Sequence, residues 1–98
     1  MIGKHRTTIQ EDDHYLIVTY VSTPVFKWAK SRGLIVLDSG GWTTATTKKR
    51  MNQCLDHIGV NARVYQKNHD WYIDINGTTI DFFDGVCFMP AEFGGEAE

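Results

Sequence analysis

The sequence predicts an α+β protein in which one α-helix packs on one face of an antiparallel β-sheet of about five or six strands. A run of apolar residues at 34–37 is too short for a helix and is typical of a buried strand. A pair of glycines ends this run, and a pattern of helical period follows over 43–58. Farther along, Asn76 and Gly77 separate two β-rich segments, which is a strong signal for a hairpin. The predicted order of elements is therefore β-β-(β)-α-β-β-β.

The bulk composition favours one small globular domain. The chain has 98 residues, of which 42% are hydrophobic, enough to form a core. The net charge of −2 lacks the basic excess of a dedicated DNA-binding protein. No apolar segment resembles a leader peptide or approaches the ~20 residues of a membrane span. We expect a single soluble domain, 1–98, with a flexible arm at 1–13 and a flexible acidic tail at 91–98.

The segment before the apolar run is expected to contribute two strands. Residues 15–21 are rich in β-branched and aromatic side chains and predict a strand that Pro24 ends or bends. Residues 25–32 fit either a strand or one to two helical turns. An edge strand is the favoured interpretation, and a turn at 31–33 then leads into the strand at 34–37.

The helix is expected to begin within 43–47 and to end at 57 or 58, followed by Gly59 in the usual position after a helix. The helical wheel places Lys49 and Arg50 away from the apolar stripe, so replacing them should barely affect the core. The stripe that should face the sheet consists of Thr47, Met51, Cys54, Leu55 and Ile58.

The second half of the chain is predicted to be β-structure. A two-residue turn at Asn76-Gly77 should be of type I′ and sets the register of the hairpin, with Ile73 opposite Ile80. The predicted strands span 62–67, 71–75, 78–82 and 86–89.

The turn before the helix is the candidate binding site. Free N–H groups of the glycines and the positive end of a helix dipole favour an anion there, although the P-loop pattern is absent. The cations Lys48, Lys49 and Arg50 lie in the first helical turns, where the helix dipole destabilises each of them by roughly 0.3–1 kcal/mol. The favoured interpretation is that water solvates them. The alternative is that they meet a phosphate or a carboxylate. Trp42 is expected to anchor the core rather than to form an exposed stacking platform. The candidate binding residues are Ser39, Gly40, Gly41, Trp42, Thr43, Thr44, Thr47, Lys48, Lys49 and Arg50.

No pattern in the sequence predicts catalysis, a metal or a cofactor. Cys54 and His57 are spaced as two ligands on a helix, but no second pair follows. Ser39 lacks a nucleophile motif and an assigned base, and Asp84 is expected to face solvent in an ordinary turn. Cys54 and Cys87 are expected to be two buried thiols, with a single disulfide as the alternative.

Two stretches resemble a group of small tailed-bacteriophage proteins. They are LDSGGWTTATTKKRMNQ at 37–53 and VYQKNHDWYIDINGTTIDFFDG at 64–85, and the resemblance spans 34–85. The group has no assigned activity, so the resemblance implies phage origin and the cytoplasm of an infected bacterium as the compartment. Residues 24–32, outside the resemblance, are a candidate insertion.

Two functions are consistent with these features. The preferred hypothesis is a phage accessory protein that inhibits or modulates a host or defence macromolecule, for example as an anti-CRISPR protein, by direct protein–protein binding without catalysis. The alternative is binding of nucleic acid or a nucleotide phosphate by the Gly-Gly-Trp turn and the Thr-Thr-Lys-Lys-Arg helix start. In that case Trp42 or Tyr65 would stack on bases, and Arg63 and Lys67 would contact phosphates.

Overall fold

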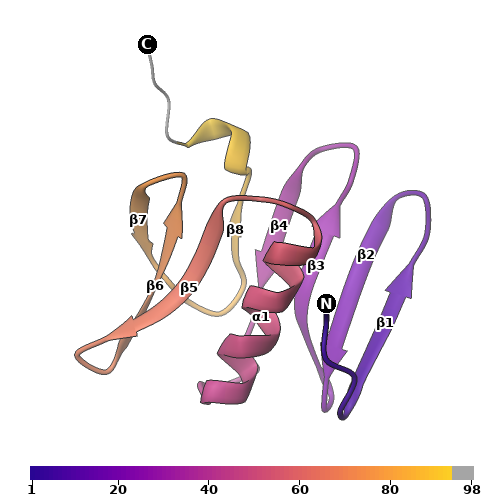
Figure 1. Ribbon diagram of the computed structural model, residues 1–98, viewed down its shortest axis with the longest axis horizontal. Helices are drawn as coiled ribbons and strands as arrows, with labels where there is room; N and C mark the ends of the chain where they lie inside the picture. Colours follow the sequence, from indigo (N-terminus) through magenta and orange to yellow (C-terminus); the bar gives the residue numbers. More distant parts are fainter. Residues whose placement is uncertain (94–98) are drawn as a thin grey trace.

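The computed structural model describes residues 1–93, which form one α-helix and eight β-strands in two antiparallel sheets (Figure 1). The α+β class is confirmed, and the single helix lies between the fourth and fifth strands. The strands form a five-stranded and a three-stranded sheet rather than one sheet of about five or six. No helix in the described part of the chain is long and apolar enough to cross a membrane. Of the expected flexible tail, residues 94–98 lie outside the described residues.

The five-stranded sheet contains the first four strands and the last one. Because β8 returns to pair with β4, its register places Ile35 opposite Phe88 and Leu37 opposite Val86, all four buried. The strands, in the order of the sheet, are β1 (Thr7–Glu11), β2 (Tyr15–Tyr20), β3 (Thr23–Ala29), β4 (Leu34–Leu37) and β8 (Val86–Phe88).

Residues 1–13 belong to the fold, contrary to the expected flexible arm. Strand β1 pairs with β2 along its whole length, and the side chain of Ile2 is buried in the core. The segment looks unstructured in sequence because β1 is an edge strand whose last four residues are all exposed. An edge strand of this kind carries no apolar alternation to recognise.

Strand β3 lies in the middle of the sheet, so the prediction of an edge strand is wrong. Pro24 is accommodated because the register of β2 and β3 shifts between Val18 and Thr19. This bulge leaves one residue of β3, Val25, without a partner in β2, and both Val25 and Phe26 are buried.

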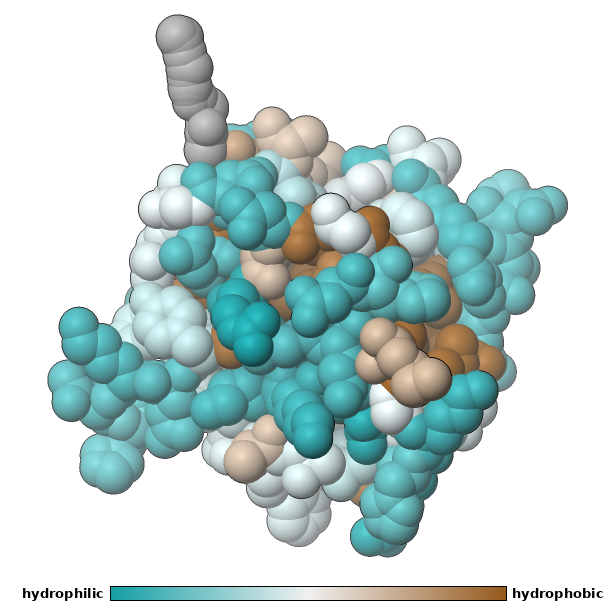
Figure 2. Space-filling view, in the orientation of Figure 1, coloured by the Kyte–Doolittle hydropathy of each residue, from teal (hydrophilic) through white to brown (hydrophobic). Residues whose placement is uncertain are grey.

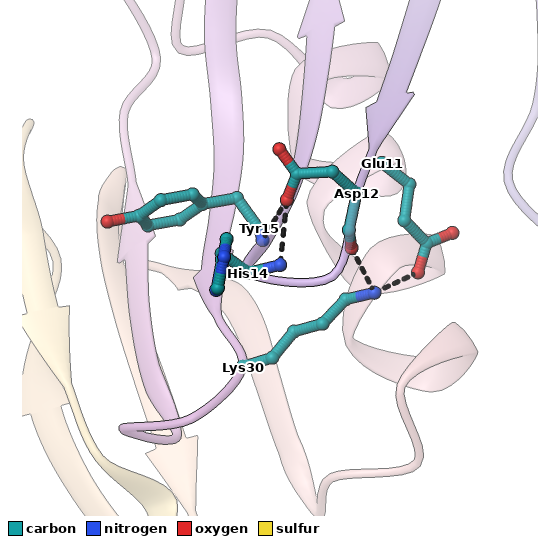
Figure 3. Close-up of polar contacts among 5 residues, drawn as sticks. All are labelled: Glu11, Asp12, His14, Tyr15 and Lys30. Atoms are coloured by element: carbon teal, nitrogen blue, oxygen red, sulfur yellow. Dashed lines mark hydrogen bonds and ion pairs between the residues drawn. The ribbon is translucent and has the colours of Figure 1, made fainter.

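One end of the sheet is tied together by Asp12 and Lys30 (Figure 3). Oδ1 of Asp12 accepts the N–H groups of His14 at 2.7 Å and Tyr15 at 2.8 Å, which closes the turn between β1 and β2. Backbone hydrogen bonds from Tyr15 and His14 hold the pKa of Asp12 below its ordinary value. Nζ of Lys30, just after β3, donates to the carbonyl of Asp12 and pairs with Glu11, each at 2.7 Å.

The second sheet has the order β5 (Ala62–Lys67), β6 (Asp70–Ile75), β7 (Thr78–Asp81). The predicted hairpin is confirmed: Ile73 pairs with Ile80. Asn76 and Gly77 have φ of 50° and 90°, as a type I′ turn requires. A 3-10 helix, η1 (Pro90–Glu92), follows β8.

The helix α1 (Ala45–His57) begins and ends where the sequence predicts. Thr44 is the N-cap, and its Oγ1 accepts the N–H of Thr47 at 3.2 Å. Gly59, with φ of 77°, follows the last turn. The helix contacts β2, β3 and β5, so its apolar stripe packs between the two sheets; Thr47, Met51, Cys54 and Leu55 are buried, and Ile58 is partly buried.

Arg50 is buried, with 6% of its surface exposed, which corrects the expectation that it points to water. Its Nη1 donates to Oε1 of Gln53 at 2.8 Å, and its Nη2 donates to the carbonyl of His5 at 3.4 Å. The guanidinium lies 5.3 Å from the ring centre of Tyr20. The N-terminal segment covers this face of the helix, and a side chain at Gly3 would collide with Nη1 of Arg50.

Candidate binding surface at the start of the helix

The loop between β4 and α1 is held by the carboxylate of Asp84, which lies between β7 and β8. Oδ1 of Asp84 accepts the N–H of Ser39 at 2.8 Å and the hydroxyl of Ser39 at 2.7 Å. Oδ2 accepts the N–H of Gly41 at 3.2 Å. We call these contacts the Asp84 clamp. The clamp joins the two stretches that resemble phage proteins and links two loops that are distant in the sequence.

The Asp84 clamp changes the interpretation of the glycine turn. The N–H of Gly41 is used by Asp84, and the N–H of Gly40 is donated to Oδ1 of Asp38 at 2.7 Å. Gly40 has φ of 64°, and a Cβ there would lie 2.3 Å from Oγ1 of Thr23, so glycine is required. The turn is therefore occupied by the protein's own carboxylates, and Asp84 is not an ordinary solvent-facing residue.

The ionisation of Asp84 follows from the same contacts. Partial burial raises the pKa of Asp84, but the hydrogen bonds from Ser39 and Gly41 lower it by more, so the net pKa lies below the ordinary value. Ser39, only 1% exposed, donates both its N–H and its hydroxyl to this carboxylate, and its Oγ also accepts the N–H of Gly41 at 3.2 Å.

We expect Asp84→Asn to lower the free energy of unfolding by about 1–2 kcal/mol at pH 7, because an amide oxygen accepts more weakly than a carboxylate. Folding lowers the pKa of Asp84, so this stabilisation is present above the unfolded pKa of about 4 and disappears as the pH falls through the folded value. Urea unfolding from pH 7 downward should show parent and variant converging as the pH falls through the folded pKa of Asp84. An equal difference at every pH would contradict the clamp, and Ser39→Ala should be non-additive with Asp84→Asn.

Trp42 is exposed over 69% of its surface, so the expectation of a core anchor is wrong. The core position near the helix start is taken by Trp71, which is 8% exposed and packs against Phe82 with ring centres 5.3 Å apart. Nζ of Lys48 lies 5.6 Å from the ring centre of Trp71. Phe83, next to Asp84, is exposed over 61% of its surface. Trp42 therefore directly follows Gly41 of the Asp84 clamp, and Phe83 directly precedes Asp84.

An open groove of about 230 Å³ lies between Thr43, in the loop before α1, and residues of the second sheet and of the loop that follows it. A second groove, of about 550 Å³, adjoins it and shares Asp70, Trp71, Phe82 and Phe83. We call the area formed by Trp42, Thr43, Lys48, Trp71 and Phe83 the Trp42 surface. Much of the face that carries α1 is hydrophilic, with apolar side chains visible in smaller areas (Figure 2). The residues that line the smaller groove are Thr43, His69, Asp70, Trp71, Phe82, Phe83 and Asp84.

The structure separates the ten candidate binding residues into groups with different roles. Ser39, Gly40 and Gly41 hold the loop, while Thr44 and Thr47 form the helix cap, their hydroxyls 3.0 Å apart. Arg50 lies buried under the N-terminal segment. Of the other four, Trp42, Thr43 and Lys49 are exposed and Lys48 is half-buried.

Sequence reasoning missed Phe83 and Asp84 as parts of this surface. A signal for Phe83 was available, because Phe83 lies outside the predicted strand at 78–82 and directly before the turn at Asp84-Gly85, and connecting segments run over the protein surface. No local signal identifies Asp84, because its hydrogen bonds reach 43 and 45 residues back along the chain.

The two cysteines are free, so no disulfide links them. Burial raises the pKa of the Cys54 thiol to about 12. Cys87 is exposed, contrary to the expectation of two buried thiols, because it points away from the core between Val86 and Phe88. Within residues 1–93, no three His, Cys, Asp or Glu side chains gather as a metal site would require.

The fold and the Trp42 surface define a small α+β protein that displays exposed aromatic side chains on two loops joined by the Asp84 clamp. The chain belongs to the phage family described as Kyanoviridae Gp96 protein, which matches residues 3–89. This confirms the resemblance to a small phage protein group, and the match extends beyond 34–85 to include 24–32. No curated protein and no solved structure matches the chain.

Proposed function

We propose that this protein is a phage accessory protein that binds a host or defence protein through the Trp42 surface, in the cytoplasm of the infected bacterium, and inhibits or modulates it without catalysis. The observation that carries the proposal is the exposure of Trp42 and Phe83, at 69% and 61%, on loops that the Asp84 clamp joins. Tryptophan is enriched among residues that dominate binding energy at protein interfaces. A loop already held in place loses little conformational freedom on binding, which favours affinity.

The charges around the Trp42 surface favour a protein partner. Carboxylates of Asp70 and Asp84 line the groove beside the aromatic residues, and they would repel a nucleic-acid backbone. Arg50 is buried and therefore unable to contact phosphates. Mixed charges around exposed aromatic side chains are typical of protein–protein interfaces. A CRISPR effector or another defence complex is the kind of target we propose.

One observation favours the alternative, nucleic-acid binding. Lys48, Lys49 and Arg63 line a common groove on α1 and β5, of about 380 Å³, where phosphates would find three cations. Of the proposed stacking residues, Tyr65 packs against Tyr72 with ring centres 5.7 Å apart, whereas Trp42 is free to stack.

We expect Trp42→Ala and Phe83→Ala each to weaken partner binding by about 30-fold or more, as at interface hot spots, and to leave the melting temperature nearly unchanged. The measurement is affinity capture from phage-infected host lysate with a tagged chain, followed by titration of the captured protein. Tyr15→Ala is the matched control, because Tyr15 is also an exposed aromatic residue, 42% accessible, but lies at the far end of β2.

The same variants separate the two functions. If nucleic acid is the ligand, gel shifts with mixed oligonucleotides should weaken steeply with salt, and Lys49→Glu and Arg63→Glu should abolish them. Equal capture of the same proteins by the parent, Trp42→Ala and Phe83→Ala would contradict the proposed surface.

A further inference from the structure

Strand β1 ends the five-stranded sheet, and its outer edge is open. Figure 1 shows β1 at the margin of the molecule, with no described segment beyond it. The strand pairs with β2 in constant register from Thr7, opposite Tyr20, to Glu11, opposite Leu16. An edge of this kind presents main-chain groups that another strand can pair with.

Two hydrogen bonds show which residues of β1 face outward. The N–H of Asp12 donates to the carbonyl of Tyr15 at 3.0 Å, and the N–H of Val21 donates to the carbonyl of Arg6 at 2.8 Å. In an antiparallel ladder, residues whose main chain bonds to the neighbour alternate with residues whose main chain points away. Even-numbered residues of β1 therefore bond to β2.

The odd-numbered residues direct their main-chain groups away from the sheet. Ile9 and Glu11 each present an N–H and a carbonyl, and Thr7 presents a carbonyl, since its N–H donates to Lys4 at 3.2 Å. Ile9 is also 38% exposed. No proline or lysine occurs in β1 to protect this edge.

The other sheet edges are less suited to pairing. On β5, the side chain of Asn52 occupies both main-chain groups of Val64, at 2.8 and 2.9 Å. Strand β8 has only three residues. Strand β7 ends at Asp81 and is followed by Asp84, with no cation at its other end to complement them.

The charges at the ends of β1 have opposite sign. Lys4 and Arg6 precede the strand, and Glu11, Asp12 and Asp13 end and follow it, so the edge runs from basic to acidic, although Glu11 is also paired with Lys30 of the same chain. We propose that two copies of this chain pair antiparallel through β1, centred on Ile9, and join their five-stranded sheets into one. This arrangement brings the basic end of each strand to the acidic end of the other, whereas parallel pairing would oppose like charges.

The pairing satisfies all of these open groups except the carbonyl of Glu11, and it does so in a symmetric way. The N–H of Ile9 donates to the carbonyl of Ile9 in the second copy, and the N–H of Glu11 donates to the carbonyl of Thr7. Each bond occurs twice by symmetry. The two Ile9 side chains cover one another, and Arg6 lies opposite Asp12 of the second copy. The Trp42 surface uses other elements, so this inference does not depend on the proposed function.

The test is sedimentation equilibrium of the intact chain over a range of concentrations. The parent should shift from one to two monomer masses as concentration rises, and the dimer should weaken with added salt. Ile9→Pro should weaken dimerisation at least tenfold while the monomer stays folded by circular dichroism, because the N–H it removes points away from β2. Ile9→Val, which retains that N–H, should still dimerise.

A charge reversal tests the register. Arg6→Glu should weaken the dimer about tenfold at low salt and less at high salt, whereas Arg32→Glu, in the exposed turn after β3, should have no effect. Monomers at every concentration up to about 1 mM would overturn the proposal. A dimer that Ile9→Pro leaves intact would overturn it as well, because that dimer must use another surface.

Discussion

Arg50→Glu is expected to lower the free energy of unfolding by about 3–5 kcal/mol, whereas Lys49→Glu should leave it nearly unchanged. Arg50 is 6% exposed, and the groups that meet its guanidinium are the acceptors Oε1 of Gln53 and the carbonyl of His5. A glutamate at position 50 would place a buried carboxylate against these acceptors, with no donor to replace water. Lys49 is exposed, and a negative charge in the early helix is slightly favourable.

Urea unfolding of the two variants measures this difference directly. Arg50→Met is an informative third variant, because Nε of Arg50 is buried without a hydrogen-bond partner. Replacing a buried cation by an apolar side chain of similar length should cost much less than Arg50→Glu, or even stabilise the fold. If Arg50→Glu melts like the parent, the N-terminal segment does not cover the helix, and the helical-wheel expectation for Arg50 would be right after all.

Ile73→Ala should lower the free energy of unfolding by about 2–5 kcal/mol, because it opens a cavity where the isoleucine side chain has no exposed surface. Ile73 lies in β6, the middle strand of the second sheet, between Val64 of β5 and Ile80 of β7. Its loss therefore weakens both strand pairings as well as the core. If the slope of the unfolding free energy against denaturant concentration is unchanged, the substitution has changed the stability of the folded state.

Ile80→Ala is the matched control for Ile73→Ala. The two isoleucines face one another across the hairpin, but Ile80 is only partly buried. Ile80→Ala should therefore lower the free energy of unfolding by less than Ile73→Ala does. Equal costs for the two substitutions would mean that both side chains are equally buried, contrary to the observed packing of β7 at the edge of its sheet.

The elements with local signals in the sequence were the predictable ones. The I′ turn at Asn76-Gly77 was predictable because few residues other than Asn and Gly adopt positive φ, and the turn then sets the pairing of Ile73 with Ile80. The helix was predictable because a threonine cap precedes it and a glycine follows it. The apolar run of β4 was recognisable because burial on a strand leaves a short hydrophobic segment.

The contacts between distant segments could be identified only from the folded structure. The return of β8 to β4 divides the strands into two sheets and brings Asp84 to Ser39 and Gly41. The N-terminal segment buries Arg50. A helical wheel cannot show this, because it places only the helix's own side chains and not the segments that pack on them. Trp42 is exposed, whereas Trp71, from the second sheet, fills the core near the helix start. Such outcomes depend on packing between segments far apart in the chain, and local propensity carries no information about that packing.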